Sequence, residues 1–275
     1  MYGTHAGVET FCFVPEDNLA LLDSRTFASP LAHLITVDKP GRVKKAAHLF
    51  AHLSEVTHIP QTGWRYEASQ FRGFFIAEHL LKRGNFDWLV QTISAAFGPI
   101  GIYRVFERFQ KDVGPLPRLL GVQQEANCPM YRAWKSKSAY VVPQTVTSTT
   151  QLLSRVMYDS APHTYGTYDD LRKLLTDHRG DLTTVNHEEF AEFLGADFDG
   201  RTMLDLLKEQ GIDVPAAAID KTGLIAMCAT LREIRNGTIA KGSHVLCCVT
   251  SGTSQPDGRA QPDLQIRSRP RGGTA

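Results

Sequence analysis

Residues 86–125 of this 275-residue chain read FDWLVQTISAAFGPIGIYRVFERFQKDVGPLPRLLGVQQE. A short apolar run comes first, then a turn of small residues, a helical pattern, and a second apolar run at 117–125. This order is typical of a βαβ unit, in which a helix joins two parallel strands. The small-residue turn leads into the N-terminus of the helix, where an α/β protein can hold a phosphate.

The segments on either side of this unit alternate in the same way. Apolar runs at 8–15 and 33–38 read as strands, and a helical pattern follows each of them. We expect further helices at 66–84 and 214–236 and a last strand at 243–250. Asn186 and Glu189 have the spacing of a helix capping box. Alternating strands and helices predict a parallel sheet, so the fold class is α/β.

Composition excludes several classes of function. The net charge is +1, which gives no electrostatic basis for binding nucleic acid or a membrane surface. No apolar run approaches the roughly 20 residues that span a bilayer. The first residues lack the pattern of a secretion signal, and the five cysteines do not form an even set. We therefore expect a cytoplasmic protein without nucleic-acid or membrane partners.

Three patterns of metal- or nucleophile-type residues carry little weight. His48 and His52 have the i, i+4 spacing of a zinc pair, but no third ligand accompanies them, so no metal is expected. Cys128 could act with a histidine as a nucleophile, but no oxyanion-type motif surrounds it. The pair Cys247 and Cys248 lies within an apolar run and is expected to pack in a strand.

The order of five segments resembles the fold-type II pyridoxal-phosphate-dependent enzymes, the tryptophan synthase β-like group, and most of all threonine synthase and cysteate synthase. The segments are the helix 66–84, the strand 86–93 with its turn, 117–123, 211–218, and the last strand running into 250–252. The resemblance covers residues 7–253. It implies a three-layer αβα architecture with mostly parallel sheets, and pyridoxal 5'-phosphate as cofactor.

The resemblance also implies a set of cofactor-binding residues. In the family, a glycine-rich turn after the strand wraps the cofactor phosphate with backbone N–H groups. The matching residues are Ser94, Ala95, Ala96, Phe97 and Gly98. Ser94 and Ala96 stand where the family has glycine, and Phe97 is bulkier than its counterpart. The family's last strand ends in a hydroxyl residue that faces the pyridine nitrogen, and here Thr250, with Ser251 beside it, holds that position.

The lysine that carries the cofactor in this family has no match. Its Ser-x-Lys-x-Arg stretch would precede the segment that residues 2–8 resemble, and Lys39, Lys44 and Lys45 do not fit it. We therefore expect no catalytic residue in this chain and an architecture incomplete at the N-terminus. Three explanations stay open: a truncated reading of a longer enzyme, one half of a split enzyme completed by an N-terminal polypeptide, and a degenerate paralogue.

These considerations give the expected organisation and activity. Residues 1–62 would be the remnant of a small mobile domain, 63–253 the large cofactor-binding domain, and 254–275 a disordered tail. The expected activity is a lyase or transferase reaction of amino-acid biosynthesis: replacement or elimination on a phosphorylated serine or homoserine, absent in the chain alone. The alternative is a non-catalytic pseudoenzyme or split-enzyme subunit that binds a partner protein. A homodimer is also expected.

Overall fold

The computed structural model describes residues 7–39, 42–57, 61–160, 162, 167–209, 221–249 and 258–267. The chain divides into two compact units, one formed by residues 1–59 with 254–275 and the other by residues 60–253. The first division lies close to the expected boundary at residue 62. Among the described residues, no helix is both long and apolar enough to cross a bilayer.

The first unit is built on a three-stranded parallel sheet of order β1-β2-β7. Its strands are β1 (Thr10–Pro15), β2 (Ala32–Val37) and β7 (Leu264–Ile266), and α2 (Val43–Leu53) packs on β1. Two short 3-10 helices, η1 (Glu16–Leu21) and η2 (Ser24–Phe27), replace the helix expected between the first two strands. The central strand β2 is buried along most of its length because it has a neighbour on each side.

The strand β7 corrects the expectation of a disordered tail over 254–275. In the described part of that segment, Leu264, Gln265 and Ile266 pair in parallel with β2. Asp263 precedes them and bonds Leu34 twice: its backbone N–H donates to the Leu34 carbonyl, and its carboxylate accepts from the Leu34 N–H at 2.7 Å. Backbone pairing with a buried neighbour stabilises a strand of only three residues that lies in a largely polar segment.

The second unit is a four-stranded parallel sheet of order β5-β4-β3-β6. Its strands are β3 (Trp88–Thr92), β4 (Arg118–Gln124), β5 (Asp181–Val185) and β6 (Val245–Cys248). All carboxyl ends therefore meet at one edge of the sheet. The polar β5 was not predicted, whereas the strands β3, β4 and β6 lie within the apolar runs expected for them.

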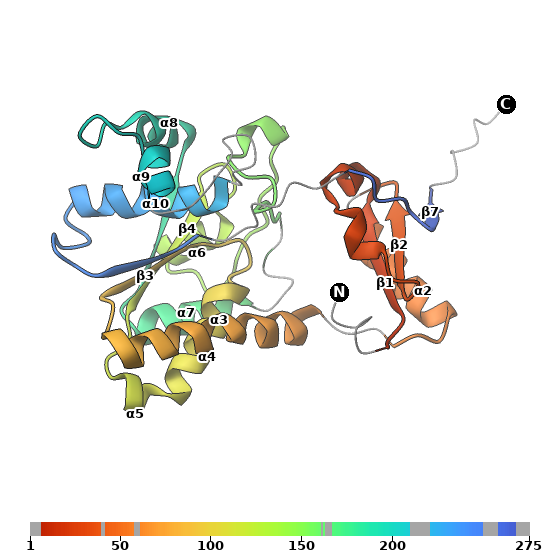
Figure 1. Ribbon diagram of the computed structural model, residues 1–275, viewed down its shortest axis with the longest axis horizontal. Coiled ribbons are helices and arrows are strands. Elements are labelled where there is room, and N and C mark those ends of the chain that lie inside the picture. Colours follow the sequence, from red (N-terminus) through yellow and green to blue (C-terminus); the bar gives the residue numbers. More distant parts are fainter. Residues whose placement is uncertain are drawn as a thin grey trace. The chain divides into compact units, whose positions relative to one another are not determined.

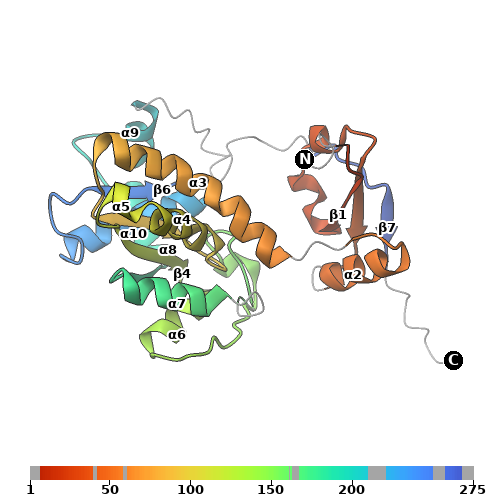
Figure 2. The same cartoon turned by 90° about the horizontal axis from the view of Figure 1, so that it is seen from below.

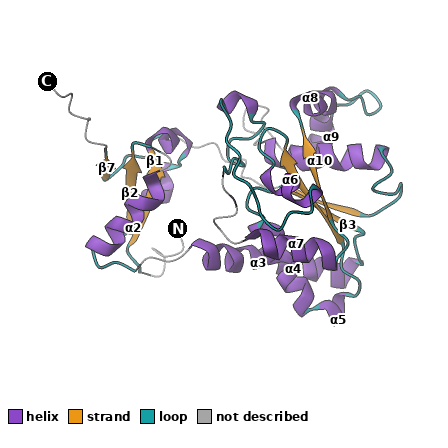
Figure 3. Ribbon diagram, turned by 180° about the vertical axis from the view of Figure 1, so that it is seen from behind, coloured by secondary structure: helices purple, strands orange, loops and turns teal. Residues whose placement is uncertain are grey.

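Helices cover both faces of this sheet (Figure 1). One face carries α3 (Gln61–Arg83), α4 (Phe97–Arg108), α6 (Pro129–Lys135) and α7 (Thr167–Asp177), with the short α5 (Gln110–Val113) following α4. The other carries α8 (His187–Gly195), α9 (Met203–Glu209) and α10 (Lys221–Arg235). In Figure 2, α3, α4 and α7 lie in front of the strands, and Figure 3 shows the strands between the helices. The predicted three-layer αβα arrangement is confirmed for this unit.

Each face has its own apolar core because side chains alternate along a strand. Leu89 of β3, and Ile93 directly after the strand, pack with α3, α4 and α7, whereas Trp88 and Val90 of β3 pack with α8 and α10. Gln91 lies between Leu89 and Ile93 in the sequence and on the same face of the sheet, the α4 side. It is polar, yet only 4% exposed.

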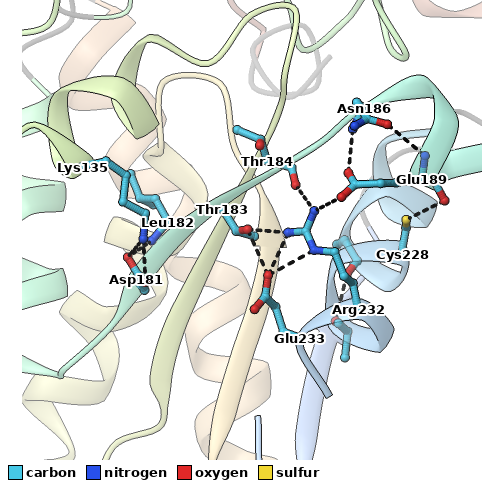
Figure 4. Close-up of polar contacts among 12 residues, drawn as sticks. Lys135, Asp181, Leu182, Thr183, Thr184, Asn186, Glu189, Cys228, Arg232 and Glu233 are labelled. Atoms are coloured by element: carbon cyan, nitrogen blue, oxygen red, sulfur yellow. Dashed lines mark hydrogen bonds and ion pairs between the residues drawn. The ribbon is translucent and has the colours of Figure 1, made fainter. Parts of the chain in front are cut away.

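A charged network fastens α8 and α10 to the end of β5 (Figure 4). The Arg232 guanidinium donates to the Thr184 carbonyl, to the Glu189 carboxylate at 2.7 Å and to the Glu233 carboxylate at 2.8 Å. Glu189 is also the third residue of α8, and it forms the predicted capping box with Asn186. The same carboxylate thus caps one helix and pairs with the other.

Candidate functional site

The predicted phosphate turn lies at the carboxyl end of β3 and borders a cavity of about 340 Å³. All five predicted turn residues, 94–98, contribute to its wall. The remaining described residues of the wall are Arg65, Ala68, Ser69 and Arg72 of α3, Gln91 and Thr92 of β3, Ile93, Pro99, and Met157. The structure thus brings α3, β3 and the start of α4 together around the turn.

The backbone of the turn adopts a conformation that glycine would adopt more easily. Ala96, the N-cap residue of α4, has φ +60° and ψ +16°, in the left-handed region. An L-residue with a Cβ pays roughly 1–2 kcal/mol there, whereas glycine does not. Ala96 therefore keeps the left-handed conformation that glycine favours, although the residue itself is not glycine.

The N-terminus of α4 has no side chain capping it. A helix leaves its first N–H groups without partners inside the helix, and its macrodipole places partial positive charge there. Phe97 and Gly98 supply such N–H groups, and Pro99 has none to supply. An uncapped helix start that borders a cavity is suited to an anion.

Close packing fixes the position of Gln91 beneath this helix start. A Cβ added to Gly98 would lie 2.5 Å from Gln91 Nε2, so glycine at this position lets the Gln91 amide come this close to the helix start. Among the described residues, Gln91 Oε1 has no hydrogen-bond partner, although it is buried. A buried amide atom without a partner is costly, which points to a ligand that completes its hydrogen bonding.

The bulk of Phe97 is accommodated by the core. Its ring packs edge-on against the ring of Tyr66, with centroids 5.2 Å apart, and Phe97 is 8% exposed. The Tyr66 hydroxyl donates to Asp170 of α7 at 2.9 Å, which ties the start of α3 to a second helix. An aromatic residue in the turn therefore attaches the turn to α3.

A loop without regular strands borders the other side of the cavity, and buried amides hold it. The Gln124 side chain bonds the backbone of Ser154 in both directions, at 3.0 and 3.1 Å. Asn127 does the same with the backbone of Asp159, at 3.2 and 3.0 Å. Met157, which reaches the cavity, lies between these two attachments. The carboxyl end of β4 thus positions this part of the wall.

These features fit a phosphate group, because the uncapped helix start offers N–H donors and the Gln91 amide donates once its oxygen and nitrogen are exchanged. The rest of the cofactor has less to bind among the described residues. Thr250 and Ser251, predicted to face the pyridine nitrogen, lie outside them. No lysine is found among the described residues of the cavity wall.

A larger hollow of about 550 Å³ lies between α6 and α7, away from the turn. Three of its basic side chains pair with aspartates: Lys135 with Asp181 at 2.8 Å, Arg172 with Asp169 at 3.5 Å, and Lys173 with Asp177. These pairs offset most of the positive charge of the wall, so we place the candidate site at the turn.

The alternative of a Cys128 nucleophile gains no support from the geometry. The Cys128 thiol donates to the Glu125 carbonyl, and burial raises its pKa, which disfavours the thiolate. His187 bonds the Gln151 carbonyl, and His163 lies outside the described residues.

Sequence reasoning missed Gln91, Arg65 and Arg72 as residues of the site. Gln91 is surrounded by apolar neighbours in β3 and gave no signal of its own. The two arginines are seven residues apart, a spacing that places both on one face of a helix, and this signal was available.

Comparison with known proteins supports the fold assignment. No protein-family model matches the chain. It is 28% identical over 173 residues to a cysteate synthase of Methanospirillum hungatei, covering 60% of this chain and 37% of that protein. It is 21% identical over 258 residues to a cysteate synthase of Methanosarcina barkeri, covering 90% and 58%. The chain thus spans between about a third and three fifths of these relatives.

Solved structures share its architecture at low sequence identity. Maize serine racemase matches 96% of this chain and 67% of its own, with a TM-score of 0.58 and 12% identity. A pyridoxal 5'-phosphate-dependent aspartate racemase matches 92% and 70%, with a TM-score of 0.54 and 14% identity. The chain therefore has the α/β fold of the fold-type II pyridoxal-phosphate enzymes, as the order of its segments predicts.

Proposed function

We propose that this chain binds pyridoxal 5'-phosphate at the turn between β3 and α4, as part of an enzyme that performs elimination or replacement on an amino acid. The observation that carries the proposal is the left-handed Ala96 at an uncapped helix start. By the resemblance of the segments, this helix start corresponds to the turn that holds the cofactor phosphate in fold-type II enzymes. The similarity to cysteate synthases supports an amino-acid substrate, and we propose the phosphorylated serine or homoserine class.

In this proposal the residues of the turn position the cofactor. The N–H groups of Phe97 and Gly98 would hold the phosphate, and the α4 dipole would stabilise its charge. Met157 and its loop would limit the access of water from one side. The cofactor, when bound, supplies a ring that accepts electrons from the substrate α-carbon. Thr250 and Ser251 remain the predicted neighbours of the pyridine nitrogen.

Cofactor binding can be tested without turnover. Pyridoxal 5'-phosphate and pyridoxal are titrated into the purified protein in phosphate-free buffer, and binding is measured by equilibrium dialysis. We expect saturable binding of the phosphorylated form, and binding of pyridoxal weaker by about tenfold or more, since it lacks the charged group. Equal binding of both forms, or none, would overturn the proposal.

A charge variant ties the binding to the turn. Ser94→Asp places a carboxylate at the phosphate position and is expected to weaken binding by at least about tenfold through like-charge repulsion. Ser243→Asp is the matched control, because Ser243 precedes β6 at the opposite end of the sheet. Equal affinities of the two variants would place the cofactor elsewhere.

A second candidate function is a subunit that binds a partner polypeptide, and the outer face of α3 favours it. Phe71, Phe75 and Leu81 are 74%, 80% and 55% exposed. Large apolar side chains gathered on one face mark protein contact sites.

Light scattering of the wild type and of a Phe71→Ser, Phe75→Ser variant tests whether this face binds a partner. A monomer in both, with or without a complementing polypeptide, would exclude it, and a homodimer lost in the variant would identify a second copy as the partner.

A further inference from the structure

The cavity at the turn has a second set of polar groups that the backbone of the turn does not account for. Arg65, Ala68, Ser69 and Arg72 of α3 all line it, at spacings of three, four and seven residues. Residues so spaced share one face of a helix. That face of α3 therefore presents two guanidinium groups to the same space as the start of α4.

The two arginines lie about two helical turns apart on α3 and have different neighbours. The Arg65 guanidinium lies 5.3 Å from the centre of the Phe97 ring, at the first residue of α4. Arg72 lies near the end of β6: burial raises the pKa of Cys248 to about 11, and the positive charge of Arg72 opposes that rise. Cys248 is paired with Gln91 of β3, so Arg72 is on the β6 side of the cavity.

Gln91 is a separate observation that points to a ligand here. It is 4% exposed, it lines this cavity, and its Oε1 has no hydrogen-bond partner among the described residues. Rotating the amide by a half turn exchanges its oxygen and nitrogen, which lets it donate to an anion. The amide then contributes a donor to the cavity that the two arginines and the helix start also line.

The charge of the wall sets the chemistry of the ligand. The described residues of the wall include two arginines and no aspartate or glutamate. The partial positive charge of the α4 N-terminus adds to them. A guanidinium presents a planar fork of donors that matches the oxygens of a phosphate. A dianion with several oxygens uses all of these groups together.

We propose that Arg65 and Arg72, with Gln91 and the N-terminus of α4, form a subsite for a phosphate monoester dianion. The phosphate belongs either to the cofactor or to a phosphorylated amino acid. The inference rests on the proposed function in sharing its cavity, but it assigns binding to α3 side chains rather than to the turn alone.

The first test uses inorganic phosphate as the probe, so it does not depend on the cofactor. Calorimetric titration compares the wild type with Arg65→Gln, Arg72→Gln and the control Arg83→Gln. Arg83 is an exposed arginine at the end of α3 that does not line the cavity. Loss of one charge-assisted hydrogen bond is expected to weaken binding about tenfold in each cavity variant, and the control should stay within about twofold of the wild type.

Two results would overturn the subsite. One is phosphate binding that is unchanged in both cavity variants, which would assign the phosphate to the turn alone. The other is no phosphate binding by the wild type. Equal urea midpoints for all four proteins establish that an affinity change is not a folding defect. Competition by chloride at equal ionic strength would also count against a site built for a dianion.

The second test identifies the source of the phosphate. If Arg72→Gln weakens pyridoxal 5'-phosphate but not pyridoxal, the arginines bind the cofactor. If it instead weakens phosphoserine but not serine, they bind the substrate, and both results support the subsite. The protein could bind inorganic phosphate through its arginines and yet not bind the cofactor. That result would overturn the proposed function and would still support this inference. An Arg72→Gln protein that binds every phosphorylated ligand as the wild type does would contradict it.

Discussion

Gly101 of α4 lies directly against Ser69 of α3, so close that a Cβ on residue 101 would come 2.4 Å from the Ser69 Cβ. The Ser69 backbone carbon would be 2.9 Å away and the Gln70 nitrogen 3.1 Å away. Ser69 belongs to the α3 face that lines the cavity. The crossing of the two helices therefore sets the distance between that face and the turn.

Gly101→Ala should destabilise the protein by about 1–3 kcal/mol, because the backbone of α3 must shift to admit the methyl group. Urea denaturation measures the change. Gly195→Ala is the control: nothing lies within 4 Å of a Cβ there, and its effect should be neutral or slightly stabilising. An unchanged midpoint in Gly101→Ala would show that the helices can separate without cost.

The Arg232 network predicts that lysine cannot replace this arginine. Arg232 donates to groups on β5, α8 and α10 at once, using both ends of its fork. A lysine keeps the charge but not the fork. Arg232→Lys should therefore cost about 1–3 kcal/mol in unfolding free energy. The matched control is Arg83→Lys at an exposed position of α3, which should change stability by less than about 0.5 kcal/mol.

Glu233 gives the same network a pH dependence. Burial acts to raise the pKa of Glu233, but hydrogen bonds from Arg232, Thr238 and Thr183, with the Arg232 charge, bring it below its ordinary value of 4.5. A carboxylate with a lowered pKa stabilises the fold above its unfolded pKa, and this stability is lost as the pH falls through the folded value. The unfolding free energy should therefore decrease as the pH is lowered below about 4.5.

The comparison that isolates this carboxylate is Glu233→Gln. The variant should be less stable at pH 7, and its stability should depend less on pH between about 5 and 3 than that of the wild type. Asp17→Asn, at an exposed site in the other unit, should leave the pH profile as it is. Parallel profiles for wild type and Glu233→Gln would assign the acid sensitivity to other groups.

The hydrogen bond between the Asp263 carboxylate and the Leu34 N–H should help to attach β7 to β2. Asp263→Ala leaves that N–H without its partner. The loss should be about 0.5–1.5 kcal/mol. Hydrogen exchange should quicken at Leu34 and at Asp38, whose N–H donates to the Ile266 carbonyl. Asp17→Ala is the control, and equal exchange in both variants would mean that β7 is held by its backbone pairing alone.

The sequence predicted the elements whose signals are local. The strand, turn and helix around Ala96 follow from an apolar run that ends in small residues, and the capping box at Asn186 follows from two residue types at a fixed spacing. Two strands were not predicted: β5 is largely polar, and β7 has only three residues within a polar segment, so both depend on buried neighbours for their pairing. Tertiary context overrides propensity in strands of this kind.

The turn that borders the candidate cavity was predicted from the sequence, whereas the side chains of its wall outside the turn were not. Strand-to-helix turns hold anions by a general mechanism, so residues 94–98 could be found from their pattern. Gln91 carries no such signal, because whether a buried amide has a partner depends on residues far away in the chain. Thr250 and Ser251 stay predictions, since they lie outside the described residues.

The conformation of Ala96 predicts that two neighbouring alanines respond differently to glycine. Ala95 and Ala96 are 2% and 3% exposed, so each loses a buried methyl group and gains freedom in the unfolded chain when changed to glycine. Only Ala96 has a positive φ. Ala96→Gly therefore also recovers about 1 kcal/mol of left-handed strain, which largely offsets its loss. Urea denaturation should find Ala95→Gly less stable than Ala96→Gly by about 1 kcal/mol, whereas equal losses in the two variants would mean that the turn at Ala96 is not left-handed in solution.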